Sequence, residues 1–221
     1  MTDESMATQA RQWYIALRWQ EYEGEGRANL LRIIAVGAFY TLHLLNYHQV
    51  NLGFLQLGEN YSVSLAFHQA VTAIAVAWTM LAMGIQVCLR QQIFPHWLKF
   101  LSTSCDVILL SAILYLGDGP RSPLIVGYFL ILALAALRLS LPLIRFTTPA
   151  VALGYLAILG VAKWPQTFGR GNVDLRVPRY EQLIVLIAIT LAGVLLGQVL
   201  RRMRSLAESV IERLEALESS R

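Results

Sequence analysis

Six long apolar stretches dominate this chain and limit what it can fold into. They lie near residues 30–47, 66–89, 98–117, 123–141, 146–164 and 181–200. A bilayer core is about 30 Å thick, so a helix needs about 20 mostly apolar residues to cross it. Only 14% of the 221 residues are charged, and the mean hydropathy is +0.53. The sequence therefore predicts an all-α integral membrane protein, a bundle of six transmembrane helices.

The apolar stretches divide the chain into three parts. Residues 1–29 form a cytoplasmic amphipathic segment, residues 30–200 the six-helix transmembrane domain, and residues 201–221 a cytoplasmic coiled-coil helix. Trp13 and Leu17 stand four residues apart among charged residues, a pattern typical of a helix lying in the membrane interface. The first ten residues are polar and acidic, so we expect no cleavable signal peptide.

The positions of the basic residues predict the orientation of the helices. With six spans, five of the 18 lysine and arginine residues fall on the side away from the termini, and the other thirteen fall on the side that both termini share. Basic loops stay in the cytoplasm, so both termini are expected there. The protein is then a multi-pass membrane protein, with membrane lipids as its immediate partners.

A seven-residue repeat runs through the C-terminal segment. Its a and d positions are Leu200, Met203, Ala207, Val210, Leu214 and Leu217. Apolar residues at these positions are typical of a coiled coil, and Arg213 at g can pair with Glu218 at the next e in a parallel dimer. We therefore expect a homodimer seam. Short patterns of this kind also occur in single amphipathic helices, so a helix that packs on its own bundle stays open.

Ionisable residues inside the spans are candidates for function because a charge in hydrocarbon is costly. Asp106 lies in the third span, while Arg138 and Arg145 lie near the cytoplasmic ends of the fourth and fifth. We expect Asp106 to pair with one of these arginines across the bundle. Such a pair is either structural or relays a charge or a proton, and the sequence leaves both open.

Three histidines are expected at similar depth near the outer face. His43 and His48 end the first span, and His68 begins the second. Interfacial hydrogen bonding is the simplest role, while a pH-sensing or outer-face ligand site, or a haem or metal site, remains open. Cys88 and Cys105 form no CxxC motif. We expect no cofactor and no metal.

No catalytic pattern is visible. The chain has no GxSxG, HExxH or P-loop motif, and its arginines form no continuous basic face of the kind that binds nucleic acid. The expectation is a non-enzymatic protein with no nucleic-acid partner.

Two stretches resemble a known family. "SCDVILLSAILYLGDGPRSPLIVGYFLILALAALRLSLPLIRF" and the later "LLGQVLRRMRSLAESVIERL" are similar to the six-helix membrane domains of bacterial sensor histidine kinases and class III adenylyl cyclases. The matching residues are Asp106, Ser122, Pro123, Arg138 and the seam from Leu200. The resemblance implies a sensory module of a bacterial inner membrane that dimerises and passes a helix movement to an output domain.

No kinase or cyclase output domain is present in these 221 residues. We therefore expect a membrane sensory or regulatory anchor that acts through its C-terminal coiled coil on an output domain or a separate cytoplasmic partner. Two alternatives remain: a small transporter or channel whose pathway includes Asp106 and Arg138, and a haem- or metal-binding membrane protein that uses His43 and His68.

Overall fold

The computed structural model describes residues 3–50, 64–91, 95–168 and 175–219, with the backbone but not the side chains given for residues 3–21, 208 and 210–219. Within these ranges the regular structure is entirely helical, which confirms the all-α prediction. The six α-helices are α1 (Asp3–Tyr47), α2 (Leu65–Arg90), α3 (Leu98–Leu116), α4 (Val126–Leu137), α5 (Leu141–Lys163) and α6 (Arg179–Ser219). Two short 3₁₀ turns, η1 (Gly119–Arg121) and η2 (Pro123–Ile125), connect α3 to α4.

Five of these helices are long and apolar enough to cross a membrane. The qualifying stretches are Tyr22–Tyr47, Leu65–Arg90, Leu98–Leu116, Leu141–Lys163 and Arg179–Ala207. The remaining apolar helix, Pro123–Leu137, is shorter. Side chains such as Met80, Ile108 and Leu153 are about two-thirds exposed, as expected for surfaces that face lipid. These features suggest a multi-pass membrane protein.

The helix ends follow local capping chemistry. The Ser64 hydroxyl accepts a hydrogen bond from the Phe67 N–H and caps α2, as the side chain of an N-cap residue does. Leu139 has a φ of 50°, a left-handed conformation that ends α4. Ser140 then precedes α5, with Pro142 in its first turn. Because proline suits that turn, α5 begins at Leu141, five residues before the predicted start at Phe146.

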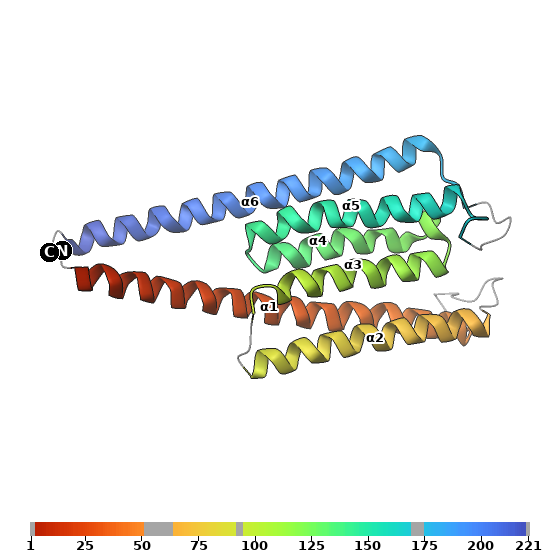
Figure 1. The fold of residues 1–221 in the computed structure, drawn as a ribbon, viewed down its shortest axis with the longest axis horizontal. Helices are drawn as coiled ribbons and strands as arrows, with labels where there is room; N and C mark the ends of the chain where they lie inside the picture. Colours follow the sequence, from red (N-terminus) through yellow and green to blue (C-terminus); the bar gives the residue numbers. More distant parts are fainter. Residues whose placement is uncertain (1–2, 51–63, 92–94, 169–174, 220–221) are drawn as a thin grey trace.

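The helices form two groups that share α4. On one side, α5 packs against α3, α4 and α6; on the other, α1 packs against α2 and α4 (Figure 1). The main buried core lies in the first group and is built from Val107, Leu110, Leu114, Tyr128, Ile131, Leu132, Val151, Tyr155, Ile158 and Ile189. Most of the buried polar residues lie on α1, on the first half of α3 and at the end of α4.

The N-terminal segment is not a separate helix. We predicted a helix lying in the interface before the first span, but α1 runs unbroken from Asp3 to Tyr47. Residues 20–29 contain no proline to break it, and Gly24 is held in the helix by its close approach to α4. The ends of α1 and α6 extend beyond the bundle at the same end of the molecule (Figure 1).

Candidate functional site

One face of α1 carries polar side chains into the bundle. Tyr22, Glu25, Asn29 and Arg32 follow at spacings of three or four residues, which places them on one side of a helix. The Tyr22 hydroxyl donates to the Leu89 carbonyl over 2.9 Å. The Asn29 Nδ2 donates to the Ala82 carbonyl at 3.0 Å and to Gln86 Oε1 at 3.1 Å. These bonds fasten α1 to α2.

Arg32 on α1 and Asp106 on α3 form a buried ion pair. Arg32 Nε donates to Asp106 Oδ1 and Nη2 donates to Oδ2, each over 2.8 Å, and the two side chains are 1% and 3% exposed. Trp78 on α2 donates its Nε1–H to the same Oδ1 at 2.8 Å. Arg32 Nη1 donates to Asn29 Oδ1 at 2.8 Å. Besides bonding to each other, the carboxylate and the guanidinium are held by two further side chains, Trp78 and Asn29, so the pair is well satisfied for its depth.

A second buried pair joins Glu25 on α1 to Arg138 at the end of α4. Arg138 Nη2 lies 2.9 Å from Glu25 Oε1, and the side chains are 2% and 1% exposed. Arg138 Nη1 donates to the Lys99 carbonyl at 3.0 Å and to Thr103 Oγ1 at 2.7 Å. The contact with Glu25 has poor hydrogen-bond alignment, so both Glu25 oxygens and Arg138 Nε and Nη2 lack a hydrogen-bond partner among the described residues. This pair rests on charge attraction alone.

The structure corrects the predicted partner of Asp106. We expected Arg138 or Arg145, but Asp106 binds Arg32 and Arg138 binds Glu25. Arg138 hydrogen-bonds to Lys99 and Thr103, about one to two turns below Asp106 on α3, because it stands at the very end of α4. Arg145 is exposed on the first turns of α5.

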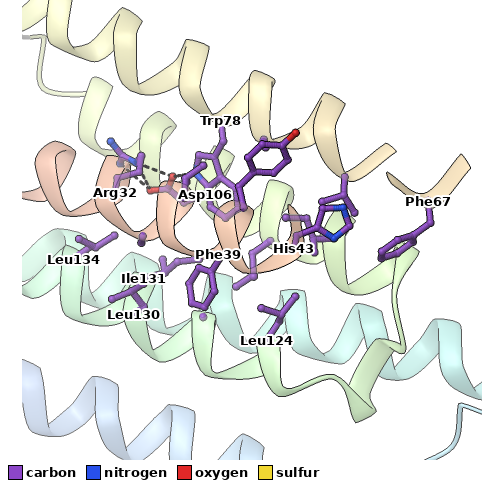
Figure 2. A pocket seen from close by; sticks show the side chains of 18 residues that line it. Arg32, Phe39, His43, Phe67, Trp78, Asp106, Leu124, Leu130, Ile131 and Leu134 are labelled. Carbon is purple, nitrogen blue, oxygen red and sulfur yellow. Dashed lines mark hydrogen bonds and ion pairs between the residues drawn. The ribbon is translucent and has the colours of Figure 1, made fainter. Parts of the chain in front are cut away.

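A cavity of about 140 Å³ lies above the Arg32–Asp106 pair, between α1, α2, α3 and the α4 region (Figure 2). Its walls are mostly apolar and include Phe39, Leu110 and Ile131. Figure 2 shows the ion pair at one end of the cavity and Phe67 at the other. An apolar space that ends on a charge pair inside a membrane bundle is a candidate binding site.

The predicted histidine cluster is formed in part. His43 Nε2 and His68 Nδ1 lie 3.1 Å apart in a hydrogen bond. The Tyr47 ring stacks on His68 with centroids 3.9 Å apart, and His48 meets Tyr47 edge-on at 5.2 Å. Among the described residues, no three His, Cys, Asp or Glu side chains come close enough to hold a metal ion. His43 lines the cavity but His48 and His68 do not, so His43 alone of these three histidines shares the site with the ion pair.

The predicted dimer seam is described only at its start. Leu200 is 3% exposed because its side chain packs inside its own bundle, whereas Met203 is 55% exposed and Ala207 is also exposed. The side chains of Val210, Leu214 and Leu217 lie outside the described residues. Extending the repeat back into the membrane reaches Ile189 and Gly193, both buried. The predicted seam therefore continues the face of α6 that packs on its own bundle as far as Leu200. Beyond Leu200, the described side chains do not distinguish a homodimer seam from a helix that packs on its own bundle.

Four site residues were not predicted: Glu25, Asn29, Arg32 and Trp78. Arg32 was counted among the basic residues that set the orientation, and Glu25 and Asn29 fell before the predicted start of the first span. Their regular spacing with Arg32 was the available signal, because polar residues repeating every three or four positions ahead of an apolar stretch mark one helix face.

No known family model, curated protein or solved structure matches this chain. Its function is therefore inferred from the geometry of the site and of the helices that carry it.

Proposed function

We propose that this chain is a membrane sensory or regulatory module that dimerises and passes a change in bundle packing through α6 to a cytoplasmic output domain or partner. The observation that carries the proposal is the continuity of α6, which runs from Arg179 to Ser219 without a break. At 1.5 Å per residue it is about 60 Å long, roughly twice the thickness of a bilayer core. A tilt or rotation of its membrane part therefore moves its far end.

The position of α6 supports this role. Arg204 Nη2 donates to the Leu139 carbonyl at 2.7 Å, in the turn that follows Arg138. Arg138 in turn is paired with Glu25 on α1. The buried charges are thus connected to α6 through adjacent residues, and contiguous contacts of this kind can carry a change in packing from one helix to another.

The resemblance to six-helix sensor domains supports the same proposal. The residues that carry it include Asp106 and Arg138, and both take part in the buried charge pairs. In such a module, a ligand that favours one of two packings shifts the population toward it.

Cysteine crosslinking tests the proposal. Single cysteines at the seam positions 203, 210 and 217 are compared with cysteines at the f positions 205, 212 and 219, in native membranes and in a chain without Cys88 and Cys105. We expect dimer-sized products at the seam positions and few at the controls. An absence of dimer at all six positions, or equal dimer at all six, would overturn the proposed seam.

A small transporter or channel is the second candidate, favoured by the cavity that ends on a buried ion pair within the apolar spans. In this case the purified protein moves solute across liposome membranes, and Asp106→Asn abolishes the flux because the charge that lines the pathway is gone. Flux that is unchanged in Asp106→Asn would remove the pathway role of Asp106.

A further inference from the structure

We infer that the cavity above the Arg32–Asp106 pair is an intramembrane binding site for a neutral hydrocarbon chain or ring that enters from the bilayer. The role of this ligand as the stimulus of a sensor rests on the proposed function, whereas the binding of the ligand in the cavity does not depend on it.

The ion-pair end of the cavity disfavours a charged ligand. Asp106 already accepts hydrogen bonds from Arg32 and Trp78, and Arg32 Nη1 donates to Asn29. Since the charges of Arg32 and Asp106 balance each other, a carboxylate or ammonium group placed here would be desolvated and would add an uncompensated buried charge, whereas a neutral ligand end leaves the pair intact.

The walls and the size fit a small apolar group. Leu110, Ile131 and Leu134 are buried around the cavity, and Phe39 and Phe67 add aromatic surface. A volume of about 140 Å³ is close to that of the engineered apolar cavity of about 150 Å³ that binds benzene. It therefore accommodates a single ring or the last several carbons of a chain.

The entrance faces the membrane. Phe39 on α1 and Leu130 on α4 both line the cavity, and they remain 45% and 36% exposed. Both residues lie within apolar helices. The ligand therefore reaches the site through hydrocarbon, between α1 and α4, and not through water.

Trp78 provides a direct reporter because it lines the cavity and contacts Asp106. The other four tryptophans, Trp13, Trp19, Trp97 and Trp164, are replaced by phenylalanine, and the protein is placed in phosphatidylcholine vesicles. Added 1-bromohexane, a neutral hydrocarbon with a heavy-atom quencher, is expected to quench Trp78 fluorescence saturably.

A matched pair of variants separates the cavity from the lipid-facing surface. Ala75 lines the cavity on α2, whereas Ala77 on the same helix is exposed and does not. Ala75→Leu is expected to reduce the quenching several-fold and Ala77→Leu to leave it unchanged. Ala35→Leu and Ala38→Leu repeat the comparison from α1, so a folding defect in one variant does not decide the result.

Two arms distinguish the source of the hydrocarbon. Quenching by 1-bromohexane in unbrominated vesicles identifies a free molecule, and quenching in vesicles of lipid brominated along its acyl chains identifies a lipid chain. Quenching from either source supports the site if Ala75→Leu reduces that quenching. Quenching from neither source, or an equal effect in Ala75→Leu and Ala77→Leu, overturns it.

The same preparation separates this site from the proposed signalling role. If 1-bromohexane quenches Trp78 in the cavity-dependent way but leaves the seam crosslinks of α6 unchanged, the binding site stands and its role as the stimulus fails. If Trp78 is quenched in that way but no seam crosslinks form, the binding site stands and the proposed function fails. If crosslinking identifies a seam but Trp78 is not quenched, the proposed function stands and the binding site fails.

Discussion

At the residue scale, the two buried ion pairs differ in how well they are satisfied. The Arg32–Asp106 pair has two parallel hydrogen bonds and further support from Trp78 and Asn29. The Glu25 carboxylate has a charge neighbour but no hydrogen-bond donor among the described residues. A fully satisfied buried polar network makes a fold more rigid. The Arg32–Asp106 pair is therefore the firmer of the two buried ion pairs between α1 and the rest of the bundle.

The first prediction concerns the cost of breaking the Arg32–Asp106 pair. Arg32→Met leaves the Asp106 carboxylate buried, with 2% of the residue exposed, and without its partner charge. The free energy of unfolding in detergent should therefore fall by about 3–5 kcal/mol. The double variant Arg32→Met, Asp106→Leu removes both charges and should recover most of that loss. Thermal unfolding of the two single variants and the double variant measures the coupling between the residues.

An exposed ion pair on the same helix provides the control. Arg27 and Glu23 lie 3.5 Å apart with side chains 71% and 56% exposed, and such a pair contributes only a few tenths of a kcal/mol. Arg27→Met should therefore leave the unfolding temperature nearly unchanged. If Arg32→Met behaves like Arg27→Met, then the buried pair does not hold α1 to α3.

The sequence predicted the charged residue but not its partner. Asp106 was identified because it lies within an apolar stretch, and a charge in hydrocarbon is costly unless it has a structural or functional role. Its partner depends on how the helices are arranged around α3, and no spacing in the chain gives that arrangement. Arg32 lies 74 residues away in the sequence and was counted only among the basic residues that predict the orientation.

At the element scale, a glycine sets the distance between α1 and α4. A Cβ at Gly24 would lie 3.0 Å from the Arg138 Cα and the Leu137 carbonyl oxygen, both backbone atoms that cannot turn aside. A Cβ at Gly26 would meet nothing within 4 Å. The close approach at Gly24 brings the neighbouring Glu25 against Arg138.

The second prediction follows from this pair of glycines. Gly24→Leu should force α1 away from α4 and destabilise the fold by about 1–3 kcal/mol. Gly26→Leu should be neutral or should stabilise by up to about 1 kcal/mol, since leucine is the better helix former. Thermal unfolding in detergent distinguishes the two, and equal effects would show that the α1–α4 contact does not depend on Gly24.

The third prediction concerns the contact between α5 and α6. A Cβ at Gly193 would overlap Thr148, whose own Cβ would be only 2.8 Å away, so rotation of the threonine cannot relieve the clash. Gly193→Ala should therefore destabilise by about 1–3 kcal/mol. One turn further along, Gly197→Ala would meet Ile144 at an ordinary 4.0 Å and should be tolerated. Unfolding temperatures that fall equally in both variants would contradict the assigned packing.

The helices themselves were largely predictable. The predicted starts of the second and third spans lie within one residue of Leu65 and Leu98, because long apolar stretches bounded by polar residues define a helix in a membrane. The errors lie where helices continue into polar sequence. The first span was predicted to start at residue 30, where the apolar stretch begins, but α1 continues back through the polar residues and through Gly24, whose close contact with α4 is visible only in the structure.

At the scale of the whole molecule, the short α4 decides how many times the chain crosses the membrane. The stretch Pro123–Leu137 is about 22 Å long at 1.5 Å per residue, less than a bilayer core of about 30 Å. Its last turn leads to Arg138, which is buried among Glu25, Lys99 and Thr103 instead of reaching an interface. A local thinning of the bilayer around this polar cluster would let so short a helix cross.

The last prediction tests six crossings against five. Single cysteines at Gln91, Gln166 and Ser205, in a chain without Cys88 and Cys105, are treated with a membrane-impermeant maleimide in intact cells. With six crossings and cytoplasmic termini, Gln166→Cys labels at once, whereas Gln91→Cys and Ser205→Cys label only after permeabilisation. Gln49→Cys, at the outer end of α1, is the positive control.

A chain in which α4 does not cross gives a different pattern. The helix α5 would then run in the opposite direction, so Gln166→Cys would be protected and Ser205→Cys would label from outside. The start of α1 and the end of α6 lie at the same end of the molecule (Figure 1), which requires an even number of crossings if both lie beyond the same face of the membrane. Six crossings would therefore be contradicted if Ser205→Cys labels in intact cells while Gln166→Cys is protected. That result would also place the α6 extension outside the cell, where no cytoplasmic partner can reach it.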